Sequence, residues 1–245
     1  IGDGAGIYMW DSDPYLENIE ILNNSSLYGG GGGIYINYRS NPFLNNVIIN
    51  GNYSSSIGGG VYINYYSNPT FSDVTISENI SDGVAGGVFM NSSSSPTLTH
   101  MNINGNIAQK GGGIYLTGGS YPTLTDIIIS GNMVSQKGGG IYFDALNSEL
   151  TIATKLLISD NYSEGHGGGI FMSAGSALNL KNSTITRNII SEGGGPAVYG
   201  AGIYSDGGSA HLINSIVYYN RREGDDGINY NLNGYTMDIL DEYNI

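Results

Sequence analysis

The residues that could perform acid–base chemistry in this sequence are few and widely separated. The 245 residues include three histidines, 21 acidic side chains, eight basic side chains and no cysteine. His166 lies in the tripeptide Gly-His-Gly, and an acidic pair lies in Gly-Asp-Asp at 224–226. A histidine acts as a general acid or base only when the reacting group lies within hydrogen-bonding reach. His100, His166 and His211 fall in different segments with no nucleophile beside them, so we assign no catalytic residue.

Metal binding would require clustered oxygen ligands, because calcium takes about six to eight of them. The acidic stretches 11–13 and 223–227 could hold calcium loosely, although acidic loops are usually only solvated. Asp73 and Asp126 occupy one position of a repeat, but other copies of the repeat place different residues there, namely Asn46, His100 and Asn182. We therefore predict no specific metal site and no cofactor other than loosely bound calcium.

The charge balance excludes two classes of partner. A net charge of −13 and an isoelectric point near 4.3 argue against binding to nucleic acid or to an anionic membrane surface, since both need basic patches. No apolar run approaches the roughly 20 residues that a membrane-spanning helix requires, and the start IGDGAGIYMW has no basic or apolar region of a signal peptide. We therefore expect neither nucleic-acid binding nor membrane insertion.

The chain is built from one unit that recurs about every 27 residues. A Gly-[Ile/Val] step recurs at Ile7, Ile34, Val61, Val88, Ile114, Ile141, Ile170 and Ile203. An asparagine that follows an aliphatic residue by three positions recurs at Asn24, Asn52, Asn79, Asn106, Asn132, Asn161, Asn188 and Asn220. A proline recurs at Pro14, Pro42, Pro69, Pro96 and Pro122. Three such series in step predict a repeat architecture.

Each unit has the period of a β-strand and not that of a helix. In 33–36, Ile34 and Ile36 share one face and Tyr35 takes the other; in 124–130, Asp126 marks a bend between two short strands. A unit this small cannot bury its own apolar face, but stacked units can cover one another. We predict an all-β, single-domain, right-handed parallel β-helix over residues 1–245, with about 8–9 coils of ~27 residues.

The recurring residues have structural roles in such a solenoid. Glycine fits where the backbone has positive φ or approaches the next coil closely. Stacked asparagine amides can hydrogen-bond along the axis, so we expect the recurring asparagines to form a ladder. Units lengthen near 150–155 and near 191–200, where we predict side loops.

One aromatic residue per unit could form a binding surface. The column comprises Tyr8, Tyr35, Tyr62, Phe89, Tyr115, Tyr142, Phe171 and Tyr204. If the neighbouring aliphatic residues point inward, these rings point outward and stack. Stacking alone would stabilise the rod, whereas an exposed aromatic face could bind sugars or a protein. Among the Asn-x-Ser/Thr sequons, Asn91 is the expected exposed acceptor for glycosylation.

These motifs resemble repeats of large bacterial surface and secreted proteins. GGGIY followed by NPTF…VTISEN or YPTLTDIIISGN is similar to right-handed parallel β-helix repeats, including the GGA[ILV] and FxxN repeats of polymorphic outer-membrane proteins. Here Ile49, Ile76, Ile103 and Ile129 replace the phenylalanine of FxxN. The resemblance covers Gly4 to about Asn231 and implies a secreted or surface-exposed protein with adhesive or structural roles.

Polysaccharide-degrading enzymes also use β-helices. Polygalacturonases resemble one another through Asn-Thr-Asp, an acidic pair, Gly-His-Gly and Arg-Ile-Lys in that order. Here 165–167 precedes 224–226, which reverses the order, and the first and last motifs are missing. His166 also occupies a turn position where other units carry Lys110, Lys137 or Ile57.

We therefore expect an extracellular or cell-surface structural or adhesive β-helix, a stalk or filament subunit, more readily than an enzyme. The alternatives are a polysaccharide lyase or hydrolase, or a sugar-binding module, with key residues partly outside this segment. No polar cap is evident at either end of the repeats, so we expect a segment of a longer chain or coils that associate end to end or laterally into fibres.

Overall fold

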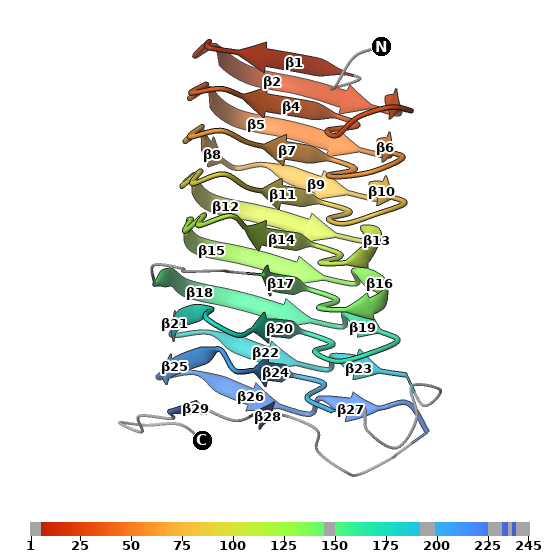
Figure 1. The fold of residues 1–245 in the computed structure, drawn as a ribbon, viewed down its shortest axis with the longest axis vertical. Coiled ribbons are helices and arrows are strands. Elements are labelled where there is room, and N and C mark those ends of the chain that lie inside the picture. Colours follow the sequence, from red (N-terminus) through yellow and green to blue (C-terminus); the bar gives the residue numbers. More distant parts are fainter. Residues whose placement is uncertain (1–5, 145–149, 192–198, 225–231, 235–236, 239–245) are drawn as a thin grey trace.

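The computed structural model describes residues 6–144, 150–191, 199–224, 232–234 and 237–238. These residues form strands and turns stacked as a solenoid, and the chain advances one layer with each coil (Figure 1). The described residues include no helix, and hence none long and apolar enough to cross a membrane. The predicted all-β solenoid with about 27 residues per turn is confirmed.

Three parallel sheets run along the rod, and each coil contributes to all three. Sheet A has the order β1 (Ile7–Trp10), β4 (Ile34–Asn37), β7 (Val61–Ile63), β11 (Val88–Met90), β14 (Ile114–Thr117), β17 (Ile141–Asp144), β20 (Ile170–Ser173), β24 (Ile203–Asp206), β28 (Leu232–Gly234). Sheet C has the order β27 (Arg221–Arg222), β23 (Ile189–Ile190), β19 (Tyr162–Ser163), β16 (Met133–Lys137), β13 (Ile107–Lys110), β10 (Ile80–Ser81), β6 (Tyr53–Ser54), β3 (Ser25–Ser26).

Sheet B is the widest, and its strands bend in the middle. Its members are β2 (Tyr15–Leu22), β5 (Phe43–Asn50), β8 (Thr70–Ser72), β9 (Thr75–Ser77), β12 (Thr97–Asn104), β15 (Thr123–Ser130), β18 (Thr151–Ser159), β21 (Ala177–Lys181), β22 (Thr184–Thr186), β25 (Ser209–Ile213), β26 (Ile216–Tyr218) and β29 (Met237–Asp238). Asp126 has a φ of 56° at the bend of β15, and Asp73 has a φ of 55° between β8 and β9. The left-handed residue therefore turns the strand without ending the sheet.

The core follows the predicted alternation. Ile34 and Ile36 of β4 are fully buried, as are Leu124 and Ile129 of β15, and each packs in one aliphatic cluster that extends from Met9 to Leu212. Pairing is parallel and residue-for-residue, for example Ile114 with Ile141. Because neighbouring coils are about 4.8 Å apart, each core side chain lies directly above its counterpart.

One of the two predicted side loops is misplaced. Thr117 pairs with Asp144, an offset of 27 residues, whereas Thr123 pairs with Ile152, an offset of 29. The two additional residues therefore lie between Asp144 and Ile152, and most of the stretch 150–155 belongs to strand β18. The second predicted loop, 191–200, contains residues 192–198, which lie outside the described residues.

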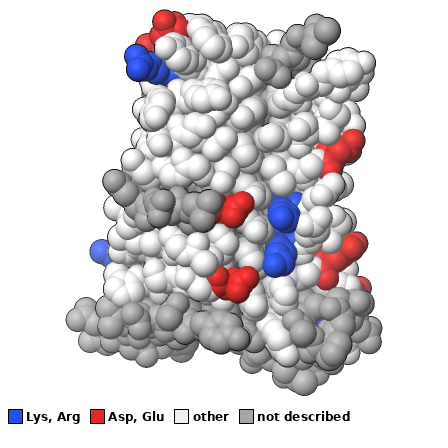
Figure 2. All heavy atoms as spheres, in the orientation of Figure 1, with Lys and Arg blue, Asp and Glu red and all other residues white. Residues whose placement is uncertain are grey.

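Charged side chains are sparse on the face of the rod shown in Figure 2, which is mostly uncharged surface. Acidic and basic groups lie there as small separate clusters and form no single-sign field. This agrees with a composition in which only 12% of residues are charged.

Close approach between coils gives a first testable prediction, at Gly113. A Cβ there would lie 2.7 Å from the backbone oxygen of Gly140, which cannot move without breaking the parallel ladder. We expect Gly113→Ala to cost about 1–3 kcal/mol or more of unfolding free energy, measured as a lower midpoint of urea unfolding.

The matched control is Gly131→Asn in the same coil. Gly131 has a φ of +63°, but a Cβ there would meet only one atom, at 3.9 Å. Asn23 and Asp160 adopt the same conformation at the equivalent position, with φ of 54° and 57°. We expect a change within about 0.5 kcal/mol; similar losses in both variants would contradict the role assigned to close approach.

Candidate functional site

The recurring asparagines form a ladder at the corner between sheets B and C. The backbone N–H and the Nδ2 of Asn79 both donate to Oδ1 of Asn106, each at 3.0 Å. Nδ2 of Asn106 in turn donates to Oδ1 of Asn132 at 2.9 Å and to the backbone oxygen of Ile76 at 3.0 Å. The same pattern runs from Asn24 to Asn220.

These amides are used for coil-to-coil bonding and not for binding at the surface. The ladder members from Asn52 to Asn220 are fully buried. The residue before each one has positive φ, as at Glu78 and Arg187, which turns the asparagine side chain inward. The sequons at Asn52, Asn79 and Asn161 therefore have no amide exposed for a glycan.

A second, shorter ladder at the corner between sheets A and B was not predicted from the sequence. The backbone N–H of Ser40 donates to Oγ of Ser67, that of Ser67 to Ser94, and that of Ser94 to Ser120, each at 3.2 Å. These serines are buried. Their signal is the Ser-Asn-Pro segment, in which the proline is conspicuous and the serine is easily overlooked.

The aromatic column stacks, but the prediction that it faces outward as an exposed binding surface is wrong. Tyr115 and Tyr142 are each only 6% exposed, and their rings are parallel with centroids 4.7 Å apart. Tyr35, Phe89 and Phe171 are also buried, Tyr62 and Tyr204 are half-buried, and only Tyr8 is well exposed. The rings lie outside the aliphatic core and form a second apolar cluster beside it.

The cover over these rings comes from the turn before each glycine triplet. Ile57, Val84 and Ala85 pack against the column in its N-terminal part. Farther along, Nζ of Lys110 lies 5.6 Å from the Tyr142 ring centroid and Nζ of Lys137 lies 4.6 Å from that of Phe171. Such cation–π contacts contribute roughly 0.5–1 kcal/mol each at exposed sites. The column is therefore a covered structural element.

His166 occupies this covering position and not a catalytic one. Its ring stacks on Tyr204 with centroids 4.3 Å apart, and its Nδ1 accepts the backbone N–H of Tyr199 at 3.1 Å. Burial and the nearby charge of Lys137 hold the pKa of His166 below its ordinary value. The Gly-His-Gly tripeptide is thus one copy of the turn, consistent with its structural interpretation.

The buried tyrosines are also unsuited to proton transfer near neutral pH. Burial raises the pKa of Tyr142 to about 12. Burial and a hydrogen bond from Tyr115 Oη to Asp144 Oδ2, 2.6 Å long, raise the pKa of Tyr115 further. Both phenols therefore stay protonated.

The accessible polar groups gather in a shallow hollow at the bend of sheet B. Its lining includes Asp73, Thr75, His100, Asn102 and Asp126, which come from three successive coils. Nε2 of His100 lies 3.7 Å from Oδ2 of Asp126, and both side chains are more than half exposed. An exposed histidine between carboxylates could bind hydroxyl groups or transfer a proton to a bound molecule. This hollow is the candidate functional site.

Exposed aromatic residues lie elsewhere, at the turns between sheets A and B in the first coils. The Trp10 and Tyr38 rings are stacked with centroids 4.8 Å apart, and Tyr65 and Tyr66 are exposed nearby in sequence register. Sequence reasoning missed this group because later coils replace these residues with serine and glycine, so no column of like residues marks it.

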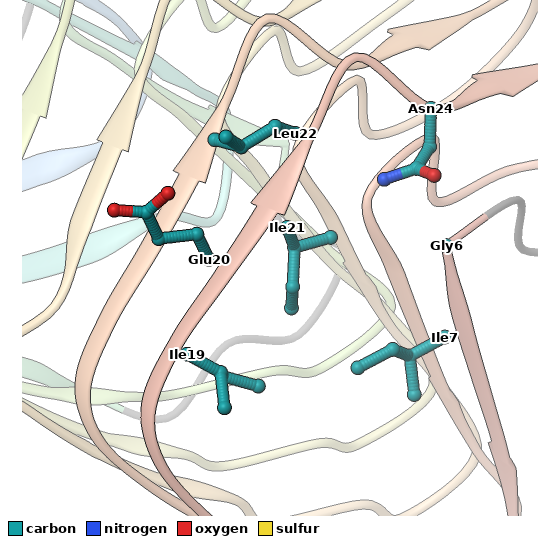
Figure 3. Close-up of a pocket in the computed structure, with 7 residues that line it drawn as sticks. All are labelled: Gly6, Ile7, Ile19, Glu20, Ile21, Leu22 and Asn24. Atoms are coloured by element: carbon teal, nitrogen blue, oxygen red, sulfur yellow. The ribbon is translucent and has the colours of Figure 1, made fainter.

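Figure 3 shows a hollow at the first coil, lined by Gly6, Ile7, Ile19, Glu20, Ile21, Leu22 and Asn24. Ile7, Ile19 and Ile21 project into the space between β1 and β2. In later coils the counterparts of these residues form the aliphatic core. The hollow is therefore an end view of the core and has no feature of a ligand site.

The remaining predicted sites are placed as follows. Asp13 uses Oδ1 to accept the backbone N–H of Asn41, so it is committed to the corner. Residues 225–227 of the acidic stretch lie outside the described residues. Among the residues that are described, no three His, Asp or Glu side chains lie close enough to hold a metal ion. Asn91 is half-buried, and its glycosylation stays a prediction.

Comparison with protein families gave one match. The family described as "Right handed beta helix region" matches residues 2–106 and 85–217. No curated protein and no solved structure matched the chain.

The ladder geometry predicts a large cost for Asn106→Ala. The substitution leaves the two donors of Asn79 and the backbone oxygen of Ile76 without their partner. Each buried group left unpaired costs about 1–3 kcal/mol, so we expect a loss of about 3 kcal/mol or more in urea unfolding. Asn102→Ala, an exposed asparagine in the same coil, is the control and should change stability by less than about 0.5 kcal/mol. Equal losses would argue against the ladder.

His166 predicts a pH dependence of stability. The unfolded chain has the ordinary histidine pKa near 6.5, above the folded value, so it binds the proton first as pH falls. The His166 contribution to stability is therefore complete above about pH 6.5 and is lost as pH falls toward the folded pKa.

The measurement is the midpoint of urea unfolding between pH 8 and pH 5. His166→Phe keeps a ring on Tyr204 and should show a smaller loss of stability than the native protein over this range. The control, His100→Asn, introduces the residue found at the equivalent Asn46 and Asn182 and should keep the native profile. A native profile in His166→Phe would rule out this source.

Proposed function

Because the chain belongs to the right-handed β-helix family, we propose that it is a rigid structural rod, an extracellular stalk, adhesin or filament subunit without catalysis of its own. One observation carries the proposal. The side chains that recur in every coil, the asparagines and the aromatic rings, are consumed in bonds and stacks between coils. Repetition in this sequence therefore serves the rod.

The composition supports a location outside the cell or on its surface. The repeats resemble those of bacterial surface and secreted proteins, and the strongly acidic, mostly uncharged surface suits a protein that must stay soluble. Self-association belongs to the same proposal. Each coil offers its neighbours a full row of ladder donors and acceptors, so coils of another copy can continue the rod.

A second candidate function is binding or cleavage of carbohydrate in the sheet-B hollow. Asp73, His100 and Asp126 line it, and Thr75 and Asn102 add groups that bind hydroxyls. The three coils place Asp73 and Asp126 about two coil spacings, roughly 10 Å, apart. His166 and the aromatic column do not contribute to this candidate, because they are covered.

Incubation with a panel of polysaccharides, with and without calcium, separates the two functions. We expect no release of reducing or unsaturated ends from any substrate. Release that is lost in Asp126→Asn and retained in the exposed control Asp82→Asn would replace the structural function with the enzymatic one. Retention of glycans without release, weakened by His100→Asn, would instead support a sugar-binding module.

A further inference from the structure

One outward column of sheet C is apolar over six consecutive coils, and we name it the sheet-C stripe. Its members are Tyr53, Ile80, Ile107, Met133, Tyr162 and Ile189, each paired with the next in parallel register. The three central side chains, Ile80, Ile107 and Met133, are 40, 43 and 49% exposed. In Figure 1 the corresponding strands follow one another along one edge of the molecule.

The surroundings of the stripe leave its centre open. Gly105 and Gly131 lie at the turn beside Ile107 and Met133 and present no side chain. The six positions of the stripe include no charge, although the chain carries 21 acidic residues. Six coils at about 4.8 Å make a straight apolar ridge roughly 24 Å long. Exposed apolar surface of this continuity marks an interaction site.

We propose that the sheet-C stripe binds the same stripe of a second copy in antiparallel orientation, with a two-fold axis at Met133. The inference rests on the proposed function as a self-associating rod and names the surface and the register. A second copy fits because its stripe has the same coil spacing, so side chains of one ridge can settle between those of the other. Such an isologous contact closes on itself as a dimer.

The charges beside the stripe select this register. With the axis at Met133, coils pair so that Ile107 faces Tyr162 and Ile80 faces Ile189 of the second copy. Glu78 and Arg187, which precede those two isoleucines in the turn column, then face each other. An axis displaced by half a coil would instead place Glu78 opposite Asp160, and like charges across an interface oppose association.

Sheet B is a poorer surface for this contact. Ile48 and Ile128 are exposed at one of its outward positions, but Thr75 and Asn102 occupy that position in the two coils between them. The apolar surface is therefore interrupted where the sheet-C stripe is continuous.

A single cysteine tests the register, because the native chain has none. Met133→Cys places two thiols at the proposed axis, and mild oxidation should give a disulfide-linked dimer at concentrations where the protein associates. Ile128→Cys is the control, with a similarly exposed side chain, 44%, on another face, and should give little dimer. Equal cross-linking of both variants would overturn the register.

Sedimentation of the same chain tests the surface. Ile107→Glu buries a charge at the proposed contact and should weaken association at least tenfold, whereas Ile128→Glu should leave it unchanged. Glu78→Arg should weaken association, and the double variant Glu78→Arg with Arg187→Glu should restore it. Circular dichroism would verify that each variant keeps its strands.

Two outcomes would overturn the proposal. One is a monomer at all concentrations, and the other is association that Ile107→Glu does not change. Neither result bears on the polysaccharide assay, so failure of the lateral contact and failure of the rod function can be told apart.

Discussion

The structure depends on one constraint: each coil must supply hydrogen-bond partners to the next at a single spacing of about 4.8 Å. The backbone satisfies it through parallel pairing, and the Asn106 amide satisfies it through one acceptor and two donor groups used together. Gly113 satisfies it by presenting no side chain where the carbonyl of Gly140 approaches. A residue that fails this condition would disturb two neighbours as well as itself.

The sequence predicts the coil well because the constraint repeats. Ile34 and Asn106 recur in fixed register, and a recurring residue type implies a recurring environment. The direction of Tyr115 was predicted, but its burial was not. Alternation places a side chain on one side of a strand, whereas burial depends on what lies over it. The covering residues vary between Ile57, Val84 and Lys110, so no pattern announces them.

Features that occur once or twice were the hardest to predict. A length difference shows that residues were added between Asp144 and Ile152, but it does not show where; the pairing of Thr123 with Ile152 settles the register. The stack of Trp10 on Tyr38 has no counterpart in later coils. His100 and Asp126 were recognised as bend residues, and their proximity follows only from coil stacking. The candidate site thus arises from neighbouring coils and not from a local motif.

The asparagine ladder also gives the rod a direction. Every ladder carbonyl that is bonded within it accepts from the coil on its N-terminal side, as Oδ1 of Asn106 accepts from Asn79. The amide carbonyl dipoles therefore add along the axis, as peptide dipoles do in a helix. Two rods of opposite orientation would cancel this dipole, and rods joined head to tail would extend it. Electrical polarity is thus a property that the buried corner gives to the whole filament axis.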